Sequence, residues 1–434
     1  MENWQLKPGD TVETTEGGKV NVKSRLGGGG QGEVYLVDFN GAQKALKWYK
    51  PSGLKNNKTA FYNNLKSNIT AGSPSDAFLW PEHLTKESKG TFGYIMRLRP
   101  SGYEDVAKFL KAKIHFASEQ ACINACLKIA NAFKLLHNEG LSYQDLNDGN
   151  FFINPQDGDV LVCDNDNVAE YGKALGIAGK PGYMAPEIII GEKSPDRWTD
   201  SFSLAVMLFL LTVLDRPFEG KMTLVPALTE KHQRQFFGER PVFIFDPNND
   251  ENRPVRGVHK NAAAFWVTYP DYIQNAFTQT FTVGLKDRER RVTEQGWEDV
   301  LMRLREETVK CPGCGWGTAY DVSKADRKCV NPSCGKQLPP LLVLKSSRFG
   351  VVIVPGAKLY AARTKAGGDI FEVSGEVIQN KNNPQLWGIR NVSDSTWYEL
   401  APDGSKKVIE KGGVVRALKG IKVDFGGGIE AVIE

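Results

Sequence analysis

The sequence predicts a bilobal α+β domain over residues 1–305, a small cysteine-bearing module over 306–338 and an all-β sandwich over 339–434. Three observations predict this order. Strand-like runs surround a glycine-rich turn near the start, and long helical patterns follow them. Four cysteines then cluster together. From Leu341 onward, short β-branched runs alternate with Gly, Asn and Asp turns, which is typical of a sandwich.

Composition narrows the functional classes. The chain has 434 residues, of which 41% are apolar and 24% charged, as in ordinary soluble globular proteins. A net charge of +4 gives no reason to expect nucleic acid as a partner. The first ten residues carry no signal-peptide pattern, and the most apolar stretch, 202–214, is shorter than the roughly 20 residues of a membrane span. We therefore expect a cytoplasmic protein without a membrane partner, and a buried helix at 202–214.

The first lobe, expected over about 1–96, begins with a phosphate-binding pattern. In "LGGGGQGEVYLV", Gly27, Gly29 and Gly32 match G-x-G-x-x-G, and Val34 follows them. Glycines let backbone N–H groups approach phosphate oxygens without a Cβ clash. A strand follows this turn, whereas a helix would follow a dinucleotide-binding turn. The pattern therefore predicts a phosphate loop between two strands.

Lys47 stands in the next predicted strand, "ALKWY", where it would hold the α- and β-phosphates of a nucleotide; the alternative is a solvated strand lysine. The helical pattern after it, "NKTAFYNNLKSNITAG", contains no carboxylate that would fix the lysine. We expect either Asp164 alone, or a substitute among Asn63, Asp76 and Glu82, to take that part.

Residues 97–102 are predicted to form the hinge between the two lobes, with the second lobe over 103–305. Met96 falls at the position that guards an adenine pocket. Leu98 lies in the hinge, where backbone groups would bind adenine.

The second lobe carries the residues expected to act on a nucleotide. Asp145 and Asn150 lie five residues apart in "SYQDLNDGNFFIN", and Asp164 ends the apolar run "VLVCD". Oxygen ligands such as Asn150 and Asp164 suit Mg²⁺ or Mn²⁺. A carboxylate such as Asp145 can orient an acceptor hydroxyl and take its proton.

Three residues downstream are expected to support the loop around Asp145 and the lobe that carries it. Glu187 in "APE" is expected to pair with Arg291, and Asp200 to brace the backbone of the loop around Asp145. With these motifs, residues 20–305 resemble a eukaryotic-type Ser/Thr protein kinase domain of a divergent bacterial kind. The resemblance is greatest to the kinase of the tellurite-resistance-associated phosphorylation triad. It implies ATP, Mg²⁺ and protein substrates. It also implies, as partners in stress-linked signalling, a metal-dependent Ser/Thr phosphatase and a von Willebrand factor A protein.

Two departures concern the activation segment. Gln144 replaces the arginine that would bind an activating phosphate, and no Ser or Thr stands between Asp164 and Glu187. We therefore expect a kinase that is not activated by Ser/Thr phosphorylation of this segment. Asn147 replaces the lysine that would neutralise the transferred phosphate, and Lys180 is expected to reach the site instead; the alternative is a solvated loop lysine.

Two further departures follow the metal-binding aspartate. Asn165 and Asp166 replace the usual Phe and Gly. A polar Asn is a poor core residue, so the Phe flip between active and inactive states is expected to be absent. For Asp166 we expect either a contact with a ligand of the metal or, preferably, a turn cap.

The cysteine module predicts a structural metal site. Two pairs of cysteines, separated by fourteen residues, supply four thiolates, and four thiolates suit tetrahedral Zn²⁺ without an open catalytic position. Disulfides are the alternative. The ligands are Cys311, Cys314, Cys329 and Cys334.

The last segment resembles a degenerate forkhead-associated (FHA) domain, through "KLYAAR", "FEVSGEV", "LWGIRNVSDSTWYEL" and "GIKVDFG". The resemblance implies phosphothreonine binding by Arg363 and Ser374. Ala362 and Val377 depart from the family pattern, so a structural or docking sandwich is an equal alternative.

Two hypotheses remain for the whole chain. One is an active kinase, favoured because Asp145, Asn150 and Asp164 are all present. The other is a pseudokinase scaffold that binds nucleotide and assembles partners, favoured by the missing helix glutamate.

Overall fold

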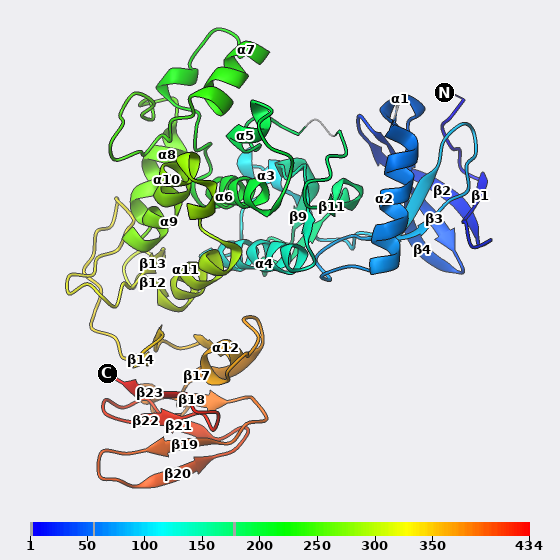
Figure 1. Cartoon of the computed structure of the whole chain (residues 1–434). Helices are drawn as coiled ribbons and strands as arrows, with labels where there is room; N and C mark the ends of the chain where they lie inside the picture. The colour runs from blue at the N-terminus through cyan, green and yellow to red at the C-terminus, as the bar shows by residue number, and fades with distance from the viewer. Residues whose placement is uncertain (1–2, 55–56, 177–178) are drawn as a thin grey trace. The chain divides into compact units, whose positions relative to one another are not determined.

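The computed structural model describes residues 3–54, 57–176 and 179–434. It divides the chain into two compact units. The first comprises 1–117, 124–265 and 275–297, and the second comprises 118–123, 266–274 and 298–434. Figure 1 follows the chain from its blue N-terminus to its red C-terminus. Among the described residues, no helix has the length and apolarity needed to cross a membrane.

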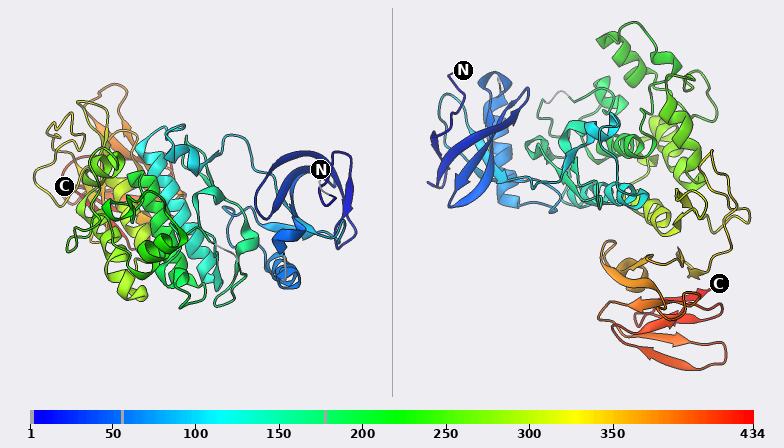
Figure 2. Two further views of the ribbon diagram at one scale, coloured as in Figure 1. Left: turned by 90° about the horizontal axis from the view of Figure 1, so that it is seen from above. Right: turned by 180° about the vertical axis from the view of Figure 1, so that it is seen from behind.

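The first unit begins with a six-stranded antiparallel sheet in the order β1-β2-β3-β4-β6-β5. Helices α1 (Pro51–Leu54) and α2 (Lys58–Ala71) follow β4, and the view from above in Figure 2 shows α2 beside the sheet. The strands are β1 (Thr11–Glu13), β2 (Lys19–Gly28), β3 (Gly32–Phe39), β4 (Ala42–Tyr49), β5 (Pro81–Leu84) and β6 (Gly93–Arg97).

Alternation along β4 decides which side chains meet α2. Successive residues of a strand point to opposite faces of the sheet. Ala45 and Tyr49 accordingly share a hydrophobic core with Phe61 and Leu65 of α2. Leu46 and Trp48 pack on the opposite face, against Trp4 and Leu6 of the N-terminal segment. Lys47 has the same parity as Ala45 and Tyr49 and therefore points toward the α2 face.

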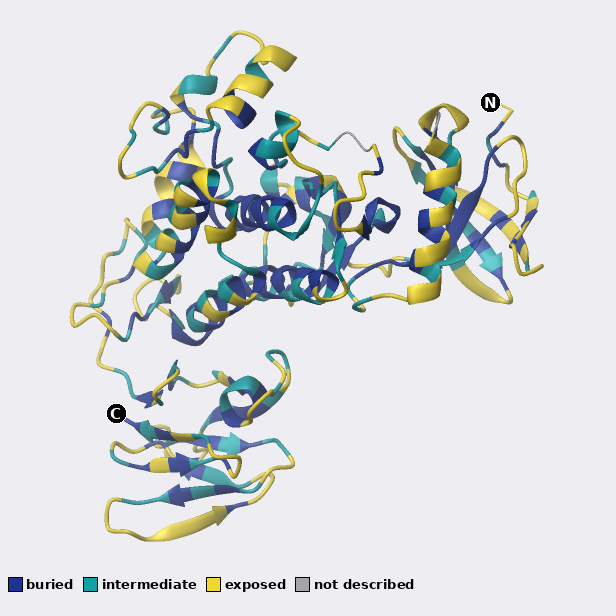
Figure 3. Cartoon of the chain, in the orientation of Figure 1, coloured by how far each residue is buried: buried dark blue, intermediate teal, exposed yellow. Residues whose placement is uncertain are grey.

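The rest of the first unit is mostly helical, around α6 (Arg197–Val213). A capping box between Asp196 and Thr199 begins α6, and the predicted apolar stretch 202–214 forms its body. Figure 3 shows α6 as almost entirely buried, which confirms the predicted core helix. The other main helices of the chain up to residue 307 are α3 (Val106–Leu110), α4 (Glu119–Asn138), α5 (Pro186–Ile189), α7 (Glu230–Gln233), α8 (Lys260–Phe265), α9 (Asp271–Phe281), α10 (Val283–Lys286) and α11 (Glu294–Glu307).

Short strands and 3₁₀ turns hold the functional segments of this unit. A three-stranded sheet runs β10-β9-β7, and β11 pairs with β8. These strands are β7 (Glu104–Asp105), β8 (Leu141–Ser142), β9 (Phe151–Ile153), β10 (Val160–Val162) and β11 (Ala169–Glu170), with 3₁₀ turns at Asp148–Asn150 and Asn165–Asn167.

The second unit contains the cysteine module and the sandwich. The hairpin of β12 (Thr308–Lys310) and β13 (Gly317–Ala319) holds the first cysteine pair. Two antiparallel sheets follow, in the orders β15-β14-β23-β22-β19-β20 and β16-β17-β18-β21. Their elements are β14 (Val343–Lys345), β15 (Gly350–Val352), β16 (Lys358–Tyr360), α12 (Ala361–Thr364), β17 (Val373–Gln379), β18 (Trp387–Asn391), β19 (Trp397–Leu400), β20 (Lys406–Ile409), β21 (Val414–Arg416), β22 (Lys422–Asp424) and β23 (Glu430–Ile433).

Both sheets contribute to one apolar core, in which Val377 and Ile389 of the four-stranded sheet join Trp397 and Phe425. The edge strand β20 stays largely exposed (Figure 3). The predicted sheet-rich C-terminal region is therefore present.

Candidate active site

One cleft of about 920 Å³ in the first unit brings together most of the residues singled out in the sequence. The glycine turn between β2 and β3 covers it, and the segment after β6 borders it. The predicted residues that line it are Gly27, Gly29, Gly32, Val34, Lys47, Met96, Leu98, Asp145 and Asp164.

The glycines of the turn differ in the space around them: Gly32 packs closely against β4, whereas Gly27 and Gly29 border open space. A Cβ on Gly32 would lie 2.3 Å from the carbonyl oxygen of Trp48, so close approach of β3 to β4 requires glycine there. Cβ atoms on Gly27 and Gly29 would meet nothing within 4 Å. Those two positions therefore leave open space along the cleft.

Asp145 is held by two asparagines. The Asn147 amide donates to its carboxylate Oδ1 at 2.9 Å, and the Asn150 amide donates to its backbone oxygen at 2.8 Å. Asn147, which replaces a lysine, thus orients the carboxylate. The side-chain oxygen of Asn150 is left as a ligand atom for a hard cation. Burial, with a smaller effect from the nearby Asp164 carboxylate, raises the pKa of Asp145 to about 6.

Asp164 has a left-handed backbone with φ of 55° at the end of β10. Its side chain is 35% exposed, whereas Asn165 behind it is buried and donates to the carbonyl oxygen of Val162 at 3.0 Å. The Tyr143 hydroxyl donates to the carbonyl oxygen of Cys163. Asp200 accepts the Tyr143 backbone N–H at 2.6 Å, so buried groups join the loop of Asp145 to the segment of Asp164.

The partner of Lys47 differs from the sequence expectation. Its Nζ lies 2.9 and 2.8 Å from the two carboxylate oxygens of Asp166, and 3.3 Å from Asp164. Asp166 is fully buried, and its carboxylate accepts hydrogen bonds from Lys47, Tyr49 and Tyr94, so it is not the expected turn cap. The expected contact of Asp166 with a ligand of the metal stays a prediction. Among the proposed substitutes, Glu82 pairs with Lys44 instead, at 2.7 Å. Burial opposes the charge on Lys47, but Asp164 and Asp166 outweigh it and raise its pKa.

Gln144 links the loop of Asp145 to the activation segment. Its amide donates to the carbonyl oxygen of Lys173 at 2.7 Å, and its side-chain oxygen accepts the backbone N–H of Leu175 at 3.1 Å. Leu175 is buried in the same apolar cluster as Phe61 and Leu65 of α2. A neutral amide therefore holds the segment where an arginine would need a phosphate.

Lys180 lies on the same segment and is half exposed. Its Nζ is 2.5 Å from Asp148 Oδ1, three residues after Asp145, and 5.2 Å from the ring centre of Tyr183. Its expected contact with a transferred phosphate stays a prediction.

Two buried ion-pair groups brace this lobe. Arg291 makes two parallel hydrogen bonds to Glu187, at 2.7 and 2.8 Å. His137 lies 3.2 Å from Asp200 and 3.0 Å from Glu294. Burial opposes its charge, but the hydrogen bonds to these carboxylates raise the pKa of His137 to about 9.

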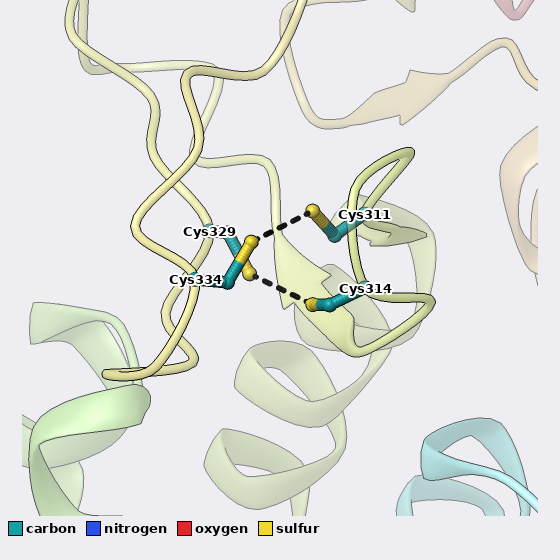
Figure 4. Close-up of side chains that lie close together, drawn as sticks. All are labelled: Cys311, Cys314, Cys329 and Cys334. Carbon is teal, nitrogen blue, oxygen red and sulfur yellow. Dashed lines mark hydrogen bonds between the residues drawn. The ribbon is translucent and has the colours of Figure 1, made fainter.

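The four predicted cysteines form a cluster in the second unit (Figure 4). The sulfur atoms of Cys311 and Cys334 are 3.8 Å apart, and those of Cys314 and Cys329 are 3.6 Å apart. A disulfide requires about 2.05 Å. Four thiolates around Zn²⁺ at about 2.3 Å would have their sulfur atoms about 3.8 Å apart. The donor set therefore fits a structural zinc ion.

The expected phosphothreonine residues are engaged inside the second unit. Arg363 lies in α12 and makes a bidentate pair with Glu306 Oε1 and Oε2, at 2.8 and 2.9 Å. Ser374 is buried and donates to the carbonyl oxygen of Leu359. Because the guanidinium already holds a carboxylate and the hydroxyl is buried, these contacts favour the alternative of a structural or docking sandwich, and phosphothreonine binding stays a prediction.

The cleft, with a glycine turn above and acidic residues below, defines a protein-kinase-like fold. Residues 20–265, more than half of the chain, match the family described as protein kinase domain, and the chain belongs to this family. It is 27% identical over 204 residues to a mouse protein named protein kinase C delta type, covering 45% of this chain and 29% of that protein. It is 27% identical over 205 residues to protein kinase C-like 1 of Candida albicans, covering 45% and 18%. The chain thus spans less than a third of the length of these relatives.

Proposed function

We propose that the chain transfers the γ-phosphate of ATP to Ser or Thr hydroxyls of protein substrates, with Mg²⁺ or Mn²⁺. The observation that carries the proposal is the convergence of Lys47, Asp145 and Asp164 on one cleft beneath a glycine turn. The family match and the protein kinase C relatives support the same activity.

The residues of the chain have separate parts in this reaction. Lys47 binds the α- and β-phosphates, and Asp164 and Asn150 offer oxygen ligands to the metal, which supplies charge neutralisation when bound. Asp145 orients the substrate hydroxyl and accepts its proton as the oxygen bonds to the γ-phosphorus. The bond from phosphorus to the bridging oxygen breaks, and ADP leaves. The raised pKa of Asp145 suits a general base.

A pseudokinase scaffold is the alternative, and the absence of a carboxylate on α2 favoured it. The buried carboxylate of Asp166 now takes the part of that missing group at Lys47. We therefore favour the active enzyme.

Transfer from labelled ATP, to the chain itself and to a general protein substrate, tests the proposal. The wild type should incorporate label that depends on Mg²⁺ or Mn²⁺. Asp145→Ala and Asp164→Ala should incorporate none. A wild type that binds ATP but transfers no phosphate would support the scaffold instead.

We further propose that activity does not require phosphorylation of the activation segment. The Gln144 amide holds Lys173 and Leu175 without an anion. Enzyme treated with a phosphatase, and verified by mass spectrometry, should keep its rate. Loss of turnover on removing a phosphate from residues 164–187 would contradict this.

The cysteine cluster is proposed to hold one structural Zn²⁺ per chain. Metal analysis should find about one zinc, and a strong chelator should unfold the module around it. A metal-free protein with unchanged thermal unfolding would contradict the proposal.

The sandwich is proposed to recruit partners in bacterial stress-linked signalling. The triad resemblance suggests a metal-dependent Ser/Thr phosphatase and a von Willebrand factor A protein. Because Arg363 is paired with Glu306, docking through another surface is favoured over phosphothreonine reading. Titration with phosphothreonine and unmodified peptides tests this, and tight binding of only the phosphorylated form would contradict it.

A further inference from the structure

We propose that Asp166 is the positioning residue for Lys47 and replaces a helix carboxylate, so that the Lys47 ion pair forms without any carboxylate on α2. The inference rests on the proposed kinase function, in which Lys47 binds the phosphates of ATP. Its geometry can nevertheless be tested in protein that holds no nucleotide.

Three side chains donate four hydrogen bonds to the Asp166 carboxylate. Lys47 and Tyr49 lie two residues apart on β4 and therefore share a face, and Tyr94 of β6 is the cross-strand partner of Lys47. The Tyr49 hydroxyl donates to Oδ2 at 2.6 Å, and the Tyr94 hydroxyl donates to Oδ1 at 3.0 Å. With Lys47 at both oxygens, the buried carboxylate is fully satisfied, as a buried charge requires.

The two tyrosines act as fixed donors. Burial, with a further contribution from the Asp166 charge, raises the pKa of Tyr49 and Tyr94 well above the usual value. Both hydroxyls therefore keep their protons at every pH at which the enzyme would work. Two neutral hydroxyls on the sheet therefore hold the carboxylate by hydrogen bonds, and Lys47 is the group that balances its negative charge.

The turn that carries Asp166 also carries a proposed metal ligand. Asp166 lies in the 3₁₀ turn Asn165–Asn167, two residues after Asp164. Lys47 contacts both carboxylates, at 2.8 Å to Asp166 and 3.3 Å to Asp164. One short turn thus fixes the positions of both Lys47 and the proposed metal ligand Asp164. No separate helix has to move into place to complete the ion pair.

Helix α2 has a different part in this arrangement. Its buried Asn64 and Asn68 both donate to the carbonyl oxygen of Val168, at 2.7 and 2.9 Å. The inner face of the helix therefore offers neutral amides to the backbone just after the turn. Helix α2 supports the position of Asp166 but supplies no partner for Lys47.

Acylation of Lys47 tests the inference directly. An amine-reactive reagent is applied at one fixed pH to the full chain without nucleotide, and mass spectrometry measures labelling of Lys47. Asp166→Asn removes the carboxylate that holds Lys47 Nζ at 2.9 and 2.8 Å, so the released amine should be labelled about tenfold faster or more. Affinity for Mg-ATP should fall in parallel. Glu82→Gln, which removes the partner of Lys44, should leave Lys47 labelling unchanged and is the matched control.

Unchanged Lys47 labelling in folded Asp166→Asn would overturn the inference. If that variant does not fold, Asp166→Glu carries the test. It keeps the charge and should keep labelling slow, and labelling as fast as in denatured protein would overturn the inference. A wild type without phosphate transfer, combined with faster labelling in Asp166→Asn, would refute the proposed function and leave the inference intact.

Discussion

Two buried ion pairs, Lys47–Asp166 in the first unit and Arg363–Glu306 in the second, have nearly the same geometry. Their shortest distances are both 2.8 Å, and the acid is at most 1% exposed in each. Their surroundings differ. Lys47 lines a cleft of about 920 Å³ beside the partly exposed Asp164, whereas Arg363 donates two hydrogen bonds from its guanidinium to Glu306. A buried cation indicates a binding site only where a cavity and a second, partly exposed carboxylate adjoin it.

The largest expected effect is a loss of phosphate transfer on changing Asp145 in the cleft, compared with an exposed aspartate outside it. Asp145→Asn removes the proposed proton acceptor with little change in side-chain size, so phosphate transfer should fall by about 10²–10⁴-fold. Rates of transfer from labelled ATP measure this, with melting temperature as the check on folding. Asp76→Asn, an exposed position, is the control and should keep the wild-type rate. Equal rates for the two variants would show that Asp145 is not the base.

The second prediction concerns the other ion pair. Arg363→Ala leaves Glu306 buried without a partner, which should lower the free energy of unfolding by about 3–5 kcal/mol. Denaturant unfolding measures the loss. Arg390→Ala removes a pair that is largely exposed and should cost less than about 1 kcal/mol. A stable Arg363→Ala protein that loses phosphothreonine binding would restore the original expectation for Arg363.

The pH dependence of activity tests whether Asp145 in the cleft acts as the base. Burial raises the pKa of Asp145 to about 6 in the free enzyme, and its protonated form cannot accept the substrate proton. The ratio kcat/KM, which reports the free enzyme, should therefore fall about tenfold per pH unit below pH 6 and level off above it. A profile that stays flat down to pH 4.5 would contradict the assignment.

The smallest effect concerns stability. His137 has a pKa of about 9 when folded and about 6.5 when unfolded, so the folded state holds the extra proton between these values. Its contribution is complete below pH 6.5 and is lost as pH rises toward 9, at most about 1.4 kcal/mol per pH unit. The lowered pKa of Glu294, about 2, affects only acidic solutions, below pH 4.5.

Unfolding of the wild type and of His137→Gln from pH 6 to 9 measures this loss. The variant should be less stable at pH 6 and should show a shallower decline. His115→Gln, at an exposed position, should follow the wild type. Parallel curves for wild type and His137→Gln would contradict the account.

Spacing along the chain made several residues of the proposed catalytic site predictable. The positions of Asp145, Asn150 and Asp164 depend on local turns and short strands, so their order in the sequence carries the information. Asp166 was missed because its role depends on Tyr49 and Tyr94, which strand pairing brings to it from distant segments. The sequence held one hint of this site: Lys47 and Tyr49 are two residues apart in a predicted strand and therefore point to the same face. The pairing of Arg363 was missed for a similar reason, since its partner Glu306 lies 57 residues away.

A double-mutant cycle on Lys47 and Asp166 tests the central claim most directly. Transfer rates and Mg-ATP affinities are measured for wild type, Lys47→Met, Asp166→Asn and the double variant. If Asp166 acts through Lys47, removing it should cost much in the wild type and almost nothing once Lys47 is gone, giving strong non-additivity. Independent, additive losses would contradict the claim that Asp166 positions Lys47.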